Sequence, residues 1–110
     1  MNTVDDKPTV KPHILIIDDE IDAVELLSLI LSKNGFTTDK TYKADEARGL
    51  LETTSRLPDV IVLDVKLPGT DGITFCKELQ KDSRYQNIPV ILVSAMCFEN
   101  DIELGYAAGA

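Results

Sequence analysis

Acidic and hydroxyl side chains follow three apolar runs of this chain, each at the point where the run ends. Asp18 and Asp19 follow the first run, Asp64 the second, and Ser94 the third. Three carboxylates brought together repel one another and raise each other's pKa unless a cation joins them. A hard divalent cation with oxygen ligands, Mg²⁺ in particular, would resolve this repulsion and commonly partners phosphate. The alternative is that each acid caps a helix or faces water.

These side chains can meet only if the apolar runs are neighbouring strands of one sheet. The runs at 14–17, 60–63 and 90–93 are continuous and rich in Ile, Val and Leu, which predicts strands buried on both faces. Helical spacing of apolar residues between the runs makes strand and helix alternate, as in an α/β fold with a parallel sheet. Ligands of such sheets bind outside the carboxyl ends of the strands. The acids and the hydroxyl would lie there.

The same patterns predict the remaining helices and strands. Helix 20–34 has more apolar surface than one stripe facing a sheet requires. In the helix that begins after Gly72, Ile73, Cys76 and Leu79 share one face. His13 leads the first strand at the end opposite the acids, so we expect it to be solvated or to cap the strand, with a ligand role as the alternative. The predicted elements are strand 14–17, helix 20–34, a weak edge strand 36–42, helix 44–55, strand 60–63, a helix after Asp71 and Gly72, strand 90–93, and helix 99–110.

Length and composition predict one domain of 110 residues, with a polar, flexible lead-in at 1–12 and the folded part at 13–110. The net charge is −8, from 11 basic and 19 acidic residues, which argues against a nucleic-acid or anionic membrane surface. No signal peptide and no membrane span are predicted, so we expect a cytoplasmic protein. Cys76 and Cys97 are widely spaced and fit buried thiols of a reducing compartment.

Three motifs in this order closely resemble the receiver domain of two-component response regulators, over residues 13–110. The resemblance implies a flavodoxin-like parallel sheet of strand order 2-1-3-4-5. The motifs are Ile-Leu-Ile-Ile-Asp-Asp-Glu at 14–20, Asp64 with Leu67-Pro68 and Asp71-Gly72, and Pro-Val-Ile-Leu-Val-Ser-Ala at 89–95.

The resemblance also implies roles for the residues at the strand ends. Asp64 would take a phosphoryl group from a histidine kinase or phosphotransfer protein, and the domain would relay a conformational signal to an output partner. Mg²⁺ would be held by Asp64, the backbone carbonyl of Lys66, and Asp18 and Asp19, with Asp18 bound directly or through water. Ser94 would contact the phosphoryl group and act as a switch. Such a domain is no conventional enzyme and at most catalyses its own phosphorylation and dephosphorylation.

The chain departs from the family pattern at its C-terminal end. Receiver domains have a fifth strand, ending in a phosphoryl-contacting Lys, and a fifth helix, whereas the last Lys of this chain is Lys81. We therefore expect strand order 2-1-3-4, a bare edge on strand 90–93 and a bare second face on helix 20–34. Such surfaces favour self-association or domain swapping, unless the chain was deliberately shortened. Lys66 could bring its ammonium group to the phosphoryl group, or it could be a solvated surface residue.

Two other functions remain open at this point. The first is a receiver-like binding or assembly module that no longer signals by phosphorylation. The second is a metal-dependent phosphatase of the haloacid dehalogenase type, which also begins with an aspartate after an apolar strand. That chemistry requires a second acid two residues later, where this chain has Lys66.

Overall fold

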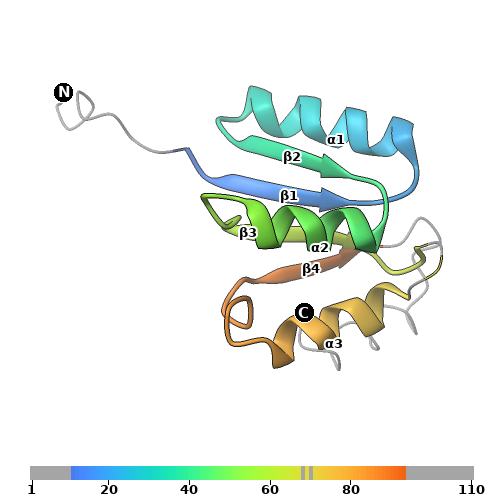
Figure 1. Ribbon diagram of the computed structural model, residues 1–110. Coiled ribbons are helices and arrows are strands. Elements are labelled where there is room, and N and C mark those ends of the chain that lie inside the picture. The colour runs from blue at the N-terminus through green and yellow to red at the C-terminus, as the bar shows by residue number, and fades with distance from the viewer. Residues whose placement is uncertain (1–10, 68, 70, 94–110) are drawn as a thin grey trace, which may run out of the picture.

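The computed structural model describes residues 11–67, 69 and 71–93, which form four strands and three helices (Figure 1). Each of these elements lies within a few residues of its predicted position. The predicted helix 99–110 and Cys97 lie outside the described residues. The elements are β1 His13–Ile17, α1 Ile21–Lys33, β2 Thr37–Thr41, α2 Ala44–Thr53, β3 Val60–Asp64, α3 Gly72–Lys81 and β4 Val90–Val93.

The four strands form one parallel sheet in the order β2-β1-β3-β4, which confirms the predicted fold class and strand order. β1 pairs with β2 and β3, and β3 also pairs with β4. The polar strand β2 lies at one edge, as predicted from its alternating sequence. Because all four strands run the same way, their carboxyl ends lie along one edge of the sheet.

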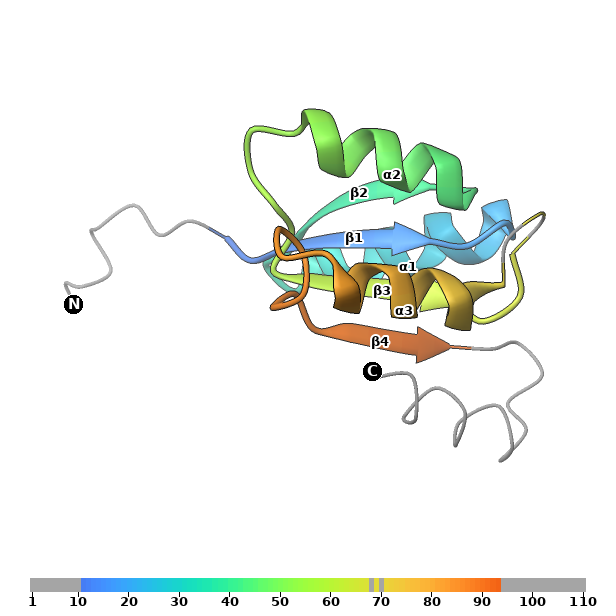
Figure 2. The ribbon, with the colours of Figure 1, turned by 60° about the horizontal axis from the view of Figure 1, so that its bottom comes forward.

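Helices cover both faces of the sheet, with α1 on one face and α2 and α3 on the other (Figure 2). The side chains of β1 alternate between the two layers. Ile14 and Ile16 pack in a cluster with Val24 of α1, whereas Leu15 and Ile17 join the larger cluster formed with α2 and α3. A strand buried on both faces accounts for the unbroken apolar run in the sequence.

The outer face of α1 is apolar and exposed. Ile21, Leu26, Leu29 and Ile30 are 48–61% exposed, and Val24 is the only fully buried residue of this helix. Within the described part of the chain, no second element covers this face. Helix α1 therefore has the wide apolar surface that its sequence predicted.

The described edge strand β4 also presents apolar side chains. Ile91 is 53% exposed and Val93 is 37% exposed, and β4 pairs with β3 alone among the described strands. Backbone groups on the other side of β4 have no strand partner within residues 11–93. No helix of the described residues has the length and apolar character needed to cross a membrane.

Helix α3 packs on the sheet through the face that sequence spacing predicted, together with two residues that the spacing did not indicate. Cys76 and Leu79 are buried in the core cluster, and Ile73 is partly buried against the same cluster, which confirms the predicted face. Phe75 is 1% exposed and takes the central position of this contact, and Gly72 is buried as well. The buried face of α3 is therefore wider than predicted and includes the first residue of the helix.

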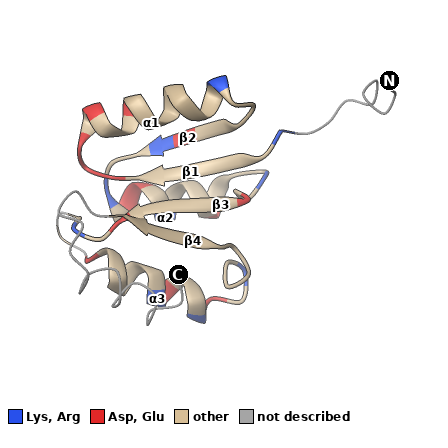
Figure 3. Ribbon diagram, turned by 180° about the vertical axis from the view of Figure 1, so that it is seen from behind, with Lys and Arg blue, Asp and Glu red and all other residues tan. Residues whose placement is uncertain are grey.

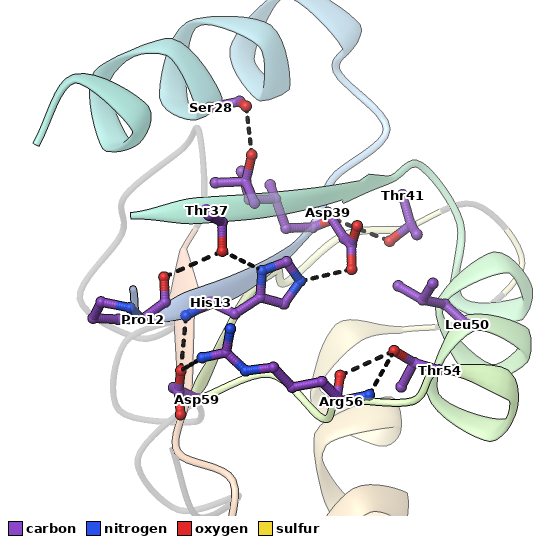
Figure 4. Close-up of polar contacts among 12 residues, drawn as sticks. Pro12, His13, Ser28, Thr37, Asp39, Thr41, Leu50, Thr54, Arg56 and Asp59 are labelled. Atoms are coloured by element: carbon purple, nitrogen blue, oxygen red, sulfur yellow. Dashed lines mark hydrogen bonds and ion pairs between the residues drawn. The ribbon is translucent and has the colours of Figure 1, made fainter. Parts of the chain in front are cut away.

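The amino end of the sheet is tied together by polar contacts around His13 (Figure 4). The imidazole Nδ1 lies 2.6 Å from the Thr37 hydroxyl, and Nε2 lies 2.7 Å from the Asp39 carboxylate. The His13 backbone N–H donates to Asp59, which also accepts from Arg56. His13 thus connects β1 to β2 and to the loop before β3, at the end of the sheet opposite the acids.

Candidate functional site

Asp18 and Asp19 lie directly after β1, where hydrogen bonds hold the backbone of the loop. The Asp18 N–H donates to the Thr41 carbonyl at 3.1 Å, and the Asp18 carboxylate accepts from the Glu20 N–H at 2.9 Å. Thr41 is itself buried, and its hydroxyl donates to the Ile16 carbonyl at 3.0 Å. The end of β2 therefore fixes the point at which the chain leaves the sheet with its acid pair.

Asp64 is the last residue of β3 and is 9% exposed. The backbone continues in contact with β4 beyond this residue, because the Val65 N–H donates to the Val93 carbonyl at 2.9 Å. The Lys66 N–H then turns back and donates to Asp64 Oδ1 at 3.2 Å. A buried carboxylate at a rigid strand end is thus held by the loop that follows it.

The structure brings these two strand ends together. One carboxylate oxygen each from Asp18, Asp19 and Asp64 lies within 4.8 Å of the others. Acids drawn in red run from the end of β1 into the start of α1 in Figure 3. Ser94 lies outside the described residues. Lys66 lies beside the cluster with its side chain exposed.

The surroundings of Asp64 disfavour its charged form. Burial of the carboxyl group, together with the smaller effects of the neighbouring Asp18 and Asp19, raises the pKa of Asp64 to about 6. The main opposing contribution to this pKa comes from the Lys66 amide and not from a lysine or arginine side chain. The negative charge of the cluster is therefore only weakly compensated by the protein itself.

The chemistry of this cluster fits a hard cation. All three side chains offer carboxylate oxygens, which are the ligands of hard divalent cations, and no nitrogen or sulfur ligand belongs to the group found among the described residues. A cation there would relieve the repulsion that raises the pKa of Asp64. These residues can therefore hold a divalent metal, although their role as ligands stays a prediction.

Two residues of the site had no functional reading in the sequence. Thr41 is one polar residue of an edge strand, and nothing in its neighbours indicates that it anchors Asp18. Gly72 was recognised as part of the second motif and as the start of a helix, without a role of its own, whereas in the structure its N–H donates to the Val65 carbonyl at 2.8 Å. A Gly directly after an Asp cap is a local signal for a close contact, but it does not name the partner.

Residues 14–110 match the family model of the response regulator receiver domain. The chain belongs to this family. Solved receiver structures agree with the fold: the Francisella response regulator 1452 receiver domain superposes with a TM-score of 0.79 at 31% identity, covering 90% of this chain and 78% of that one. The chemotaxis response regulator CheY4 of Vibrio cholerae gives a TM-score of 0.81 at 25% identity, covering 92% and 82%.

Curated relatives of this receiver domain are longer proteins. The DNA-binding response regulator MtrA of Mycobacterium tuberculosis is 32% identical, over 93% of this chain and 42% of its own length. The phosphate regulon transcriptional regulatory protein PhoB of Rhizobium meliloti is 35% identical, over 90% of this chain and 43% of its own length. The chain thus spans about two fifths of the length of these relatives.

Proposed function

We propose that this receiver domain accepts a phosphoryl group on Asp64 in a two-component system and relays a conformational signal to an output partner. The donor would be a histidine kinase or a phosphotransfer protein. The observation that carries the proposal is the position of Asp64, a largely buried carboxylate at a strand end with one oxygen within 4.8 Å of carboxylate oxygens of Asp18 and Asp19. Family membership supports the same role.

In the proposed reaction a carboxylate oxygen of Asp64 attacks the phosphorus atom of a phosphohistidine. The new oxygen–phosphorus bond forms as the nitrogen–phosphorus bond breaks, and the leaving imidazole keeps the electron pair and takes up a proton. A carboxylate is a weak nucleophile, so the rate depends on positioning and on charge neutralisation. The Lys66 amide holds one oxygen of Asp64 and so fixes the direction of the other.

Mg²⁺ is the cation that we propose for the acid cluster. Asp19, Asp64 and the Lys66 backbone carbonyl would hold it, with Asp18 contributing directly or through water. When bound, the ion neutralises negative charge on the carboxylates and on the phosphoryl group. Ser94 would donate a hydrogen bond to a phosphoryl oxygen and report phosphorylation by moving.

We propose that the domain is cytoplasmic. Its net charge of −8 leads us to propose also that it contacts neither nucleic acid nor membrane through its own surface. DNA binding is part of the name of MtrA, whose full length is more than twice the matched part. Any such activity of a longer protein would therefore use surface outside this domain.

Phosphorylation of Asp64 can be tested with a small phosphodonor such as acetyl phosphate. With Mg²⁺ present, the parent protein should gain the mass of one phosphoryl group, and chelation by EDTA should prevent this gain. Asp64→Asn should abolish labelling because it removes the nucleophile, whereas Asp45→Asn, at a highly exposed acid of α2, should leave labelling unchanged. Intact-protein mass spectrometry provides the measurement. Labelling of Asp64→Asn would contradict the assignment, and an unlabelled parent would favour an assembly module.

Assembly is the second candidate function, and the exposed β4 edge favours it. Ile91 and Val93 present apolar side chains beside an edge that no described strand covers. A second copy could pair there, as unprotected edge strands tend to do. The same surface would serve a phosphorylated or an unphosphorylated domain.

Self-association through this edge should make the sedimentation coefficient rise with protein concentration. Ile91→Lys should abolish the rise, because a charged side chain on an edge strand opposes pairing. Leu57→Lys changes an exposed apolar residue in the loop between α2 and β3 and should leave association unchanged. Analytical ultracentrifugation distinguishes the three proteins, and a parent that stays monomeric at every concentration would refute this candidate.

A further inference from the structure

The first residue of α3 lies directly against the backbone of β3. Gly72 is buried, and a Cβ atom added to it would overlap the Asp64 carbonyl oxygen and lie 2.9 Å from Val65 Cα. Both of these atoms belong to the backbone, so neither can rotate out of the way as a flexible side chain could. Any side chain at position 72 must therefore move α3 away from β3 or displace the end of β3.

The loop between Asp64 and Gly72 transmits this contact to the carboxylate. The Gly72 N–H donates to the Val65 carbonyl, and Lys66 forms a bridge with Asp71 across the loop. The Lys66 N–H in turn donates to Asp64 Oδ1. The start of α3, the loop and the Asp64 side chain are thus linked by consecutive hydrogen bonds.

The helix start is itself fixed by a side-chain cap. The Asp71 carboxylate accepts from the Ile73 N–H at 3.1 Å, which satisfies one of the free amides of the first turn of α3. The cap and the close contact at Gly72 act together, because the first sets where the helix begins and the second sets how near it comes to β3.

We propose that Gly72 is a positioning residue for the phospho-acceptor. Its lack of a side chain allows α3 to begin on the backbone of Asp64 and Val65, and this contact keeps the Asp64 carboxylate and the Lys66 carbonyl facing Asp18. The proposal rests on the proposed function of Asp64 and adds the means by which that group is held in place.

The other described glycines have no such contact. A Cβ at Gly35, Gly49 or Gly69 would meet nothing within 4 Å. Gly35 and Gly69 have positive φ angles of 90° and 77°, so glycine is favoured at these positions by the backbone conformation. Gly35→Ala therefore destabilises the protein through backbone strain far along the chain from Asp64 and serves as a matched control for Gly72→Ala.

The test compares the Mg²⁺ affinity of the parent, Gly72→Ala and Gly35→Ala, each at a temperature where circular dichroism shows it folded. Loss of a group that orients metal ligands typically weakens metal binding by about 10–100-fold, and we expect a loss in this range for Gly72→Ala. Gly35→Ala should bind Mg²⁺ as the parent does, even though its melting temperature falls. Equal affinity of all three proteins, measured by calorimetric titration, would overturn the proposal.

Asp71→Ala provides the test if Gly72→Ala does not fold. It removes the cap that fixes the start of α3 without adding a clash, so we expect a smaller loss of Mg²⁺ affinity together with shifted NMR signals for the Asp64 and Lys66 backbone. Parental affinity and parental shifts in Asp71→Ala would refute the positioning role.

Failure of the positioning role and failure of the proposed function give different results. If the parent takes no phosphoryl group and Gly72→Ala binds Mg²⁺ more weakly than the parent, the proposed phosphorylation is refuted and the positioning role is supported. If the parent is labelled and Gly72→Ala has the same Mg²⁺ affinity and labelling rate as the parent, the positioning role is refuted and the proposed phosphorylation is supported. If the parent binds no Mg²⁺, the NMR shifts of Asp64 and Lys66 decide: changed shifts in Gly72→Ala support the contact and unchanged shifts refute it.

Discussion

Asp64→Asn should stabilise the metal-free protein at neutral pH by about 1–3 kcal/mol. Asp64 is 9% exposed, and its surroundings raise its pKa from the ordinary value of 3.8 to about 6. Ionisation of this group therefore costs more free energy in the folded state than in the unfolded chain. Asparagine keeps the shape of the side chain and carries no charge, so the variant avoids this cost. The lower part of the range allows for screening by solvent that reaches the carboxyl group.

The direction of the pH dependence follows from the raised pKa. The folded state binds the Asp64 proton more tightly than the unfolded state, so the stability contribution of this group is complete below its unfolded pKa of 3.8. That contribution is lost as the pH rises through about 6. The parent should therefore lose stability relative to Asp64→Asn as the pH rises from 3.8 to about 6, and the difference between the two proteins should be constant above that window.

Urea unfolding followed by circular dichroism, in EDTA and at several pH values, measures this difference. Glu52→Gln removes one negative charge from an exposed position of α2 and should change the free energy of unfolding by no more than about 0.5 kcal/mol. An Asp64→Asn variant that is less stable than the parent at neutral pH without metal would show that the cluster is not electrostatically strained.

Addition of Mg²⁺ should offset this difference in stability. A ligand present at about 100 times its Kd stabilises the folded state by about 2.7 kcal/mol, and Asp64→Asn should gain far less because it lacks one carboxylate of the proposed metal site. If Mg²⁺ stabilises the parent no more than it stabilises Asp64→Asn, then Asp64 is not a metal ligand. The prediction for the metal-free proteins is unaffected by that result.

The acid cluster could be predicted from sequence because strand direction alone brings its members together. Continuous apolar runs identified β1, β3 and β4, and parallel strands place their carboxyl ends at one edge of the sheet. Asp18 and Asp64 are separated by 46 positions in the chain, yet each needs only its own strand end to reach the site. This kind of inference uses local patterns plus one rule of topology.

The supporting contacts could not be predicted in this way. The role of Thr41 depends on the Asp18 N–H and the Ile16 carbonyl that face it, and that of Gly72 depends on how closely α3 approaches β3. The spacing of Ile73, Cys76 and Leu79 gave the general direction of the buried face of α3 but missed Phe75. Such errors arise because periodicity fixes a face only to within about one residue, whereas packing density decides which side chain is central.

Phe75→Ala should lower the free energy of unfolding by about 3–5 kcal/mol, the largest effect that we expect from a single truncation in this domain. The ring is 1% exposed and belongs to the cluster between the sheet and helices α2 and α3. Its removal loses the transfer free energy of the side chain and leaves a cavity. It also removes the ring beneath Arg48, whose Cζ lies 5.0 Å from the ring centroid, while the Arg48 ion pair with Glu78 can persist.

Leu29→Ala is the matched control for this truncation, because Leu29 is also in a helix but is 52% exposed, and we expect a change of at most about 0.5 kcal/mol. The loss in the free energy of unfolding for Phe75→Leu should lie between those of Phe75→Ala and Leu29→Ala. Domains of this size have total stabilities of about 5–15 kcal/mol, so the Phe75→Ala variant should have a clearly lower urea midpoint. A loss below about 1 kcal/mol would mean that α3 is not held on the sheet by this ring. The close contact of Gly72 with Asp64, one turn earlier in the same helix, would then need a different source of support.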